Sequence, residues 1–201
     1  MGGTRIERGC VMKLDRLPGT TIEIDFMKDF SAKEIIEPIF LAGGLVLSQV
    51  AQLTGLNPHV VQNWVKRKFV SPPVSKKYSK DQFCRIVIIN LLKDSLLLES
   101  ISKLISYVNG RLDDTADDII CDSLLYYYFT DVIKEISKEH GFDLINLDDV
   151  IKKVLQNEEL KHEHKNKVFQ VLKIMAVAYV SARLKNLADI YIEGLDIMEG
   201  I

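Results

Sequence analysis

Three side chains that can recognise nucleic acid bases lie close together, within residues 59–63. Gln62 and Asn63 each carry an amide that both donates and accepts, so each can make a paired hydrogen bond to a base edge, with adenine the best match. His59 lies just before them. Such chemistry is recognition rather than catalysis, and it needs a rigid element that presents the three side chains together.

Residues arranged for catalysis or metal binding are not found in the sequence. It contains no glycine-rich phosphate loop, no activated serine or cysteine motif and no pair of carboxylates with an identifiable partner. His162 and His164 are two residues apart, which places them on opposite sides of a helix, unlike the i, i+4 pair of a helical zinc site. We therefore expect no enzyme activity, no metal and no cofactor.

Two short helices joined by a tight turn would position the recognition residues. Ser48 is expected to cap the first helix, and Gly55 supplies a turn that suits a positive φ. Asn57 is a strong N-cap and Pro58 suits the first helical position, which predicts a second helix over residues 58–68. This arrangement is typical of a helix-turn-helix, whose second helix enters the major groove of DNA.

The second helix has an apolar stripe and a polar face. Val61, Trp64 and Val65 have the i, i+3, i+4 spacing of a buried stripe, so Trp64 is expected in the core rather than stacked on a base. The outer face carries the remaining polar side chains, His59, Gln62, Asn63 and Lys66.

Charge is distributed unevenly along a chain whose formal net charge is only −2. Residues 64–93 contain eight basic residues and one acidic residue, whereas residues 111–159 contain five basic and thirteen acidic residues. A basic segment beside a recognition helix favours phosphate binding. The residues expected to hold phosphates are Lys66, Arg67, Lys76, Lys77, Lys80 and Arg85.

The remaining elements are predicted to be helical. Capping boxes at Ser31 and Ser79 open two helices, the first of which should end at Gly43 and Gly44. Further helices are predicted over residues 98–108, 116–139, 147–156 and 166–193. The expected organisation is an irregular segment (1–30), a helix-turn-helix domain (31–110) and a helical domain (111–201).

The last predicted helix carries apolar residues around an unusually large part of its circumference. Such a helix lies in the centre of its domain or against a partner subunit, so we expect a homodimer formed through the C-terminal helices. The aromatic run Tyr126–Phe129 could line a ligand pocket, but consecutive helical residues point in different directions, which favours core packing.

Composition narrows the class of protein further. The 201 residues are 47% hydrophobic with 11 Gly and 5 Pro, which favours a helical globular fold. No apolar run reaches the length of a membrane span, and charges interrupt any signal peptide near the start. Cys10, Cys84 and Cys121 are too few and scattered for a disulfide framework, so buried reduced thiols and a cytoplasmic location are expected.

The order of motifs over about residues 46–108 resembles the MerR family of transcription regulators. The matching segments are Ser48–Leu56, Val61 with Trp64, Phe69–Pro72 and the helix start at Tyr78–Asp81. The whole chain is still more similar to the DUF1836 family of MerR-like bacterial proteins, in the run Lys68–Tyr78 and in Leu91–Lys93.

The resemblance implies a winged helix-turn-helix and dimeric DNA binding. By position, the wing role falls on Lys76 and Lys77, and the helix role on His59, Gln62 and Lys66. The chain departs from the pattern in its short wing, in Lys68 where a glycine is usual, and in lacking the metal-binding cysteines and long coiled coil of the best-known members.

The sequence thus predicts a mostly α protein with a MerR-like winged helix-turn-helix head and a helical-bundle C-terminal domain. Its expected function is sequence-specific binding of double-stranded DNA in bacterial transcription control. Two alternatives remain: a regulator that binds a small-molecule effector among its C-terminal helices, and an adaptor that binds protein rather than DNA.

Overall fold

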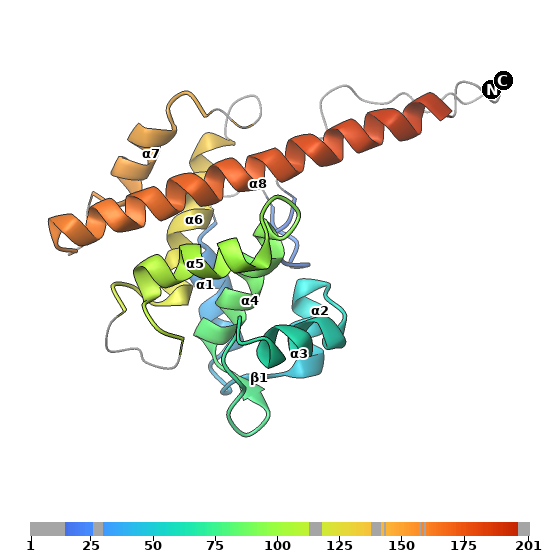
Figure 1. The fold of residues 1–201 in the computed structure, drawn as a ribbon, viewed down its shortest axis with the longest axis vertical. Coiled ribbons are helices and arrows are strands. Elements are labelled where there is room, and N and C mark those ends of the chain that lie inside the picture. The colour runs from blue at the N-terminus through green and yellow to red at the C-terminus, as the bar shows by residue number, and fades with distance from the viewer. Residues whose placement is uncertain are drawn as a thin grey trace.

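The computed structural model describes residues 15–25, 30–112, 118–137, 142, 144–156, 158 and 160–196. Within them the chain is mostly helical, which confirms the predicted fold class at that level (Figure 1). The elements are α1 (Ala32–Ile39), β1 (Leu45–Val46), α2 (Leu47–Thr54), α3 (Pro58–Lys66), β2 (Lys77–Tyr78), α4 (Lys80–Leu92), α5 (Leu98–Asn109), α6 (Asp122–Ile136), α7 (Leu147–Val154) and α8 (His162–Asp196).

Helices α4 and α6 form the centre of the molecule. Nine of the 13 residues of α4 and ten of the 15 residues of α6 are buried. Helix α8 lies across the bundle and packs on α4, α5, α6 and α7, and α2, α3 and the small sheet lie at the opposite end (Figure 1). One hydrophobic core therefore runs from Leu17 to Val180. The predicted boundary between two domains near residue 110 stays a prediction.

The N-terminal loop, residues 15–25, is built into this core. Leu17 is fully buried, and the Tyr126 hydroxyl donates to the Pro18 carbonyl oxygen at 2.7 Å. Thr21 donates its backbone N–H to Leu53 O at 2.9 Å, at the end of α2. The loop thereby joins the helix-turn-helix to α6.

Several helix ends differ from the sequence prediction. Ser31 lies at the N-cap of α1 without a side-chain cap, and α1 ends at Ile39, with Pro38 in its last turn, rather than at Gly43. Helix α2 begins at Leu47, before Ser48, and the Val46 N–H is satisfied by Gln49 Oε1 at 2.9 Å. Ser48 is therefore inside the helix and is not its cap.

The later helices also shift at their ends. Helix α6 is shorter than the predicted 116–139, whose first two residues and last two residues lie outside the described part of the chain. Helix α8 is longer than predicted, at 35 residues, or about 50 Å. Its C-terminal end extends past the other helices (Figure 1). No helix in the described ranges is both long and apolar enough to cross a membrane.

Candidate nucleic-acid interface

Helix α3 begins where the sequence predicts, and it docks through two of the three residues of its predicted stripe, since Val65 is only partly buried. The Asn57 side chain accepts a hydrogen bond from the His59 N–H at 3.1 Å, and Pro58 is the first helical residue. Gly55 has a φ of 70°, which gives the left-handed turn between α2 and α3. Val61 and Trp64 are 0% and 3% exposed, so one face of α3 is fixed in the core.

The opposite face of α3 carries the predicted recognition residues. His59, Gln62 and Asn63 are exposed, as is Lys66 one turn further along. Since their helix is anchored at its N-cap and along its apolar stripe, these side chains project from a fixed platform rather than from a mobile loop.

The end of α3 is a Schellman motif that requires an unusual backbone at Lys68. The Phe69 N–H donates to Trp64 O at 2.9 Å and the Lys68 N–H to Val65 O at 3.0 Å. Lys68 has a φ of 62°, a conformation that glycine adopts more readily. The sequence departs from the MerR pattern at this same position.

A small hairpin, residues 74–77, and a two-stranded sheet lie beside α3. Strands β1 and β2 pair antiparallel, with Leu45 opposite Tyr78 and Val46 opposite Lys77. Ser75 and Lys76 both have a positive φ, and the Lys77 N–H donates to Val74 O at 2.9 Å, as in a type I′ turn. Lys76 is therefore held at the tip of the hairpin, in the position predicted for the wing.

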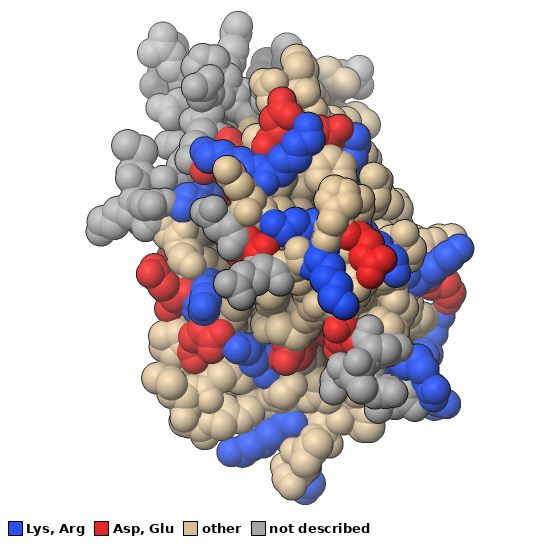
Figure 2. Space-filling model, turned by 90° about the vertical axis from the view of Figure 1, so that its left-hand side faces the viewer, with Lys and Arg blue, Asp and Glu red and all other residues tan. Residues whose placement is uncertain are grey.

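A groove of about 520 Å³ lies between α3 and the hairpin. Its lining combines α3, the hairpin and the start of α2, and consists of Val46, Leu47, Ser48, Gln62, Val65, Pro73, Lys76 and Tyr78. The lowest part of the molecule, where Figure 1 places the hairpin, carries basic side chains and no acidic ones in the view of Figure 2. Gln62 and Lys76 thus border one surface.

The structure pairs half of the basic residues of segment 64–93 with carboxylates. Arg67 contacts Glu99 at 2.7 Å, Lys80 contacts Glu37 at 2.7 Å and Lys93 contacts Asp94 at 3.4 Å. Arg67 also lies over the Phe69 ring, 4.8 Å from its centroid. The net charge counted along the sequence therefore overstates the positive charge open to a ligand.

Arg85 corrects the predicted phosphate-binding set. Its side chain is 5% exposed, and its Nε donates to Asp122 Oδ2 at 2.8 Å, between α4 and α6. Asn109 on α5 donates to the other oxygen of Asp122 at 2.8 Å. Burial raises the pKa of Asp122 to about 6, while Arg85 opposes that rise. Arg85 is thus a structural residue that cannot reach a phosphate.

Four lysines of segment 64–93 remain exposed without an ion-pair partner among the described residues. These are Lys66, Lys68, Lys76 and Lys77, around the end of α3 and the hairpin. The sequence prediction omitted Lys68, although its position two residues after Lys66 was a signal that could have included it. Of the predicted phosphate-binding residues, the structure leaves Lys66, Lys76 and Lys77 fully available.

Other residues singled out in the sequence lie elsewhere. Tyr126–Phe129 are all buried on α6, which confirms core packing. Cys84 is buried, and burial raises the pKa of its thiol, but Cys121 is exposed, so the prediction of buried thiols is wrong at that position. Cys10 lies outside the described residues. His162 and His164 lie in the first turn of α8.

Comparison with known proteins identifies part of the chain. Residues 33–129 match the family model described as "Domain of unknown function (DUF1836)". This segment, just under half of the chain, is similar to that family. The match confirms the DUF1836 part of the sequence resemblance, and the resemblance to MerR regulators stays a prediction.

One relative extends this comparison. The chain is 31% identical over 102 residues to "Uncharacterized protein YkrK" of Bacillus subtilis (strain 168). The matched part covers 49% of this chain and 39% of the relative, so the chain spans well under half of that protein's length. No solved structure matches the chain.

Proposed function

We propose that the chain binds double-stranded DNA through α3 and the hairpin at residues 74–77 and acts as a sequence-specific transcription regulator. The observation that carries this proposal is that Gln62 and Lys76 line the same groove. A side chain able to read a base edge and a cation able to hold a phosphate therefore lie on one surface.

In this proposal α3 lies in the major groove with its N-terminal half toward the bases. Gln62 and Asn63 read base edges through their amides, with His59 near the start of the helix. The exposed lysines at the end of α3 and on the hairpin neutralise phosphates on either side and release counterions. The buried stripe of Val61 and Trp64 fixes the angle of the helix.

We further infer that the DNA-binding form is a homodimer joined along α8. This helix exposes large apolar side chains that are 46–64% exposed in the single chain, namely Ile174, Val177, Leu184, Ile190, Tyr191, Ile192 and Leu195. Exposed apolar surface of this extent on a helix favours a protein partner. A two-fold dimer would present two copies of α3 to two half-sites.

A random-sequence DNA selection with the full chain at low salt tests the proposal. We expect an enriched motif with two related half-sites. A selection that enriches no motif, although the protein is folded, would contradict DNA recognition. The same selection with a Gln62→Ala, Asn63→Ala variant should lose enrichment at the bases that α3 reads.

A further inference from the structure

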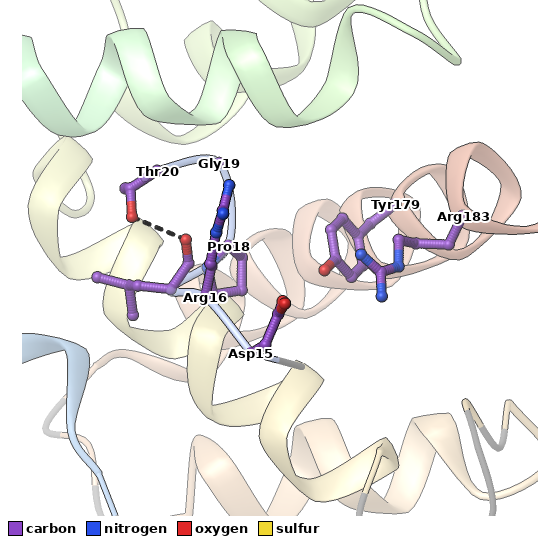
Figure 3. A pocket seen from close by; sticks show the side chains of 8 residues that line it. Asp15, Arg16, Pro18, Gly19, Thr20, Tyr179 and Arg183 are labelled. Carbon is purple, nitrogen blue, oxygen red and sulfur yellow. Dashed lines mark hydrogen bonds between the residues drawn. The ribbon is translucent and has the colours of Figure 1, made fainter. Parts of the chain in front are cut away.

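A second cavity lies on another part of the molecule, between the N-terminal loop and α8. It measures about 450 Å³, enough for a small metabolite. Its lining is mostly polar in residue type and consists of Asp15, Arg16, Leu17, Pro18, Gly19 and Thr20 from the loop, with Tyr179 and Arg183 from α8. Figure 3 shows the two α8 side chains facing the loop across this space.

The loop side of the cavity is held in a fixed conformation. Leu17–Thr20 form a turn in which the Thr20 N–H and Oγ1 donate to Leu17 O at 3.0 and 2.8 Å. Gly19 has a φ of 75°, and a Cβ there would lie 2.7 Å from Leu91 Cγ. Asn90 donates to Gly19 O at 3.0 Å. The turn is therefore fastened to α4 and requires glycine at this position.

Tyr179 lines the cavity, and its hydroxyl has no hydrogen-bond partner among the described residues. The residue is 7% exposed, and its ring makes edge contacts with Phe129 and Phe142 at centroid distances of 5.7 Å. Burial raises the pKa of Tyr179, so its hydroxyl keeps its proton and remains a donor. A donor that lines a cavity without a protein partner is available to an acceptor atom of a ligand.

The charges around the cavity have both signs. Arg16 and Arg183 line it with guanidinium groups, and Asp15 lines it with a carboxylate. Neither Asp15 nor Arg16 has an ion-pair partner in the described part of the chain. The two arginines on balance repel a purely cationic ligand, and a purely anionic ligand leaves the Asp15 carboxylate without a counter-charge. A ligand that carries both charges complements the lining.

We propose that this cavity binds a small zwitterion of the α-amino acid type. The ligand carboxylate accepts from the Tyr179 hydroxyl and the guanidinium groups of Arg16 and Arg183, and the ligand ammonium faces Asp15. The site shares no lining residue with the groove between α3 and the hairpin.

The loop also connects this site to the helix-turn-helix. Next to the cavity turn, Thr21 donates its N–H to Leu53 O at 2.9 Å and its Oγ1 to Gln52 O at 2.8 Å, in the last turn of α2. Occupancy of the cavity should therefore restrain the end of α2. A change in DNA affinity on binding follows only if the proposed function holds.

Ligand binding is tested on the full chain without DNA. Each common L-α-amino acid is titrated separately at up to millimolar concentration, with thermal stability and calorimetry as readouts. We expect at least one to bind saturably. The strongest is then compared with its deaminated carboxylate and its decarboxylated amine, both of which should bind more weakly.

Two variants locate the site. Tyr179→Phe should weaken amino acid binding by about tenfold or more without lowering the stability of the free protein, because the hydroxyl makes no hydrogen bond to a described residue. Asp15→Asn should weaken binding of the amino acid and strengthen binding of the deaminated carboxylate. Tyr107→Phe is the matched control, since Tyr107 is an exposed tyrosine on α5 that does not line this cavity.

Each outcome either supports or overturns one part of the proposal. If no amino acid binds, the assignment of the cavity is overturned, and the same holds if binding is unaffected by both Tyr179→Phe and Asp15→Asn. If the deaminated carboxylate binds as tightly as the amino acid, the proposal that the ligand is a zwitterion is wrong. Slower hydrogen exchange at the Thr21 amide on binding would support the link to α2, and unchanged exchange would refute it. None of these results depends on whether the protein binds DNA.

Discussion

Loss of the Gln62 side chain should lower the sequence-specific affinity for DNA and leave the non-specific affinity nearly unchanged. We expect Gln62→Ala to cost about 1–3 kcal/mol at the preferred site and little at sites altered at the contacted base, because a bidentate contact discriminates between bases. Binding titrations on both kinds of site measure this difference.

Gln170→Ala is the control for Gln62→Ala, since Gln170 is an exposed glutamine on α8, away from the groove. It should change neither affinity. Equal weakening of Gln62→Ala on every DNA sequence would show that Gln62 does not read bases.

Lys68 illustrates a residue held in a backbone conformation that it does not favour. Lys68→Gly should raise the free energy of unfolding by about 0.5–1 kcal/mol, because glycine adopts the observed φ of 62° more readily. Lys66→Gly, inside α3, should lower it by about 1 kcal/mol. Urea denaturation of both variants tests the opposite signs, and a destabilised Lys68→Gly would contradict this reading of the turn.

The eight basic residues of segment 64–93 differ in whether they are paired or exposed, and the sequence alone could not show this difference. Counting charges treats Arg85 and Lys76 alike. Only the fold brings Asp122, 37 residues away in the chain, against Arg85, while the hairpin leaves Lys76 exposed. By contrast, burial of Trp64 followed from its spacing to Val61, which is local information.

Among the elements, the hairpin at residues 74–77 should supply a sequence-independent part of the affinity. Lys76→Ala with Lys77→Ala should weaken binding to all DNA and reduce the slope of log affinity against log salt by about 1 for each lysine that contacts a phosphate. Affinities measured over a series of salt concentrations give this slope.

Lys152→Ala with Lys153→Ala is the matched pair for the hairpin variant, because these are two adjacent exposed lysines on α7. This pair should leave the slope unchanged. If the hairpin variant also leaves the slope unchanged, the hairpin does not contact phosphates.

Local signals predicted some elements and not others. Asn57 and Ser79 lie at the helix starts that their types indicate, because an N-cap depends only on the next three residues. The cap at Ser31 did not form. The pairing of Leu45 with Tyr78 joins two strands of two residues each, which carry too little pattern to be predicted across the intervening helices.

For the molecule as a whole, Arg85 and Asp122 make stability depend on pH. The pKa of Asp122 is raised in the fold to about 6 from its ordinary value of 3.8, so this carboxyl takes up a proton on folding between these values. Its contribution to stability therefore falls as pH rises through that window. Removing Arg85 should raise the pKa of Asp122 further. The loss of stability with rising pH would then continue to higher pH.

We expect Arg85→Met to destabilise the fold by about 3–5 kcal/mol near neutral pH, because it leaves a buried carboxylate unpaired. The loss should be smaller at about pH 5, where Asp122 is protonated more readily. Urea denaturation at about pH 5 and pH 7.5 compares the two. Arg67→Met, which breaks an exposed pair with Glu99, should cost under about 1 kcal/mol at both. An equal loss at both pH values for Arg85→Met would contradict the role given to Asp122.

The proposed dimer makes a separate prediction at this scale. Leu184→Glu with Tyr191→Glu places charge on the exposed apolar face of α8 and should convert the dimer to monomer. Asn186→Glu adds a charge at another exposed position of the same helix and should leave the dimer intact. Analytical ultracentrifugation measures both. A wild-type chain that sediments as a monomer at all accessible concentrations would refute this interface.

The position of Leu17 bears on how the segment that matches the family model, residues 33–129, should be handled in the laboratory. A fragment trimmed to residues 33–129 would lack both Leu17 and the buried side chains of α8, and would expose to water the apolar surfaces of α4 and α6 that they cover. Such a fragment is prone to aggregate. An insoluble product, or one without DNA affinity, would then report on the missing core and not on α3. Activity assays on this family segment should therefore carry the flanking chain on both sides.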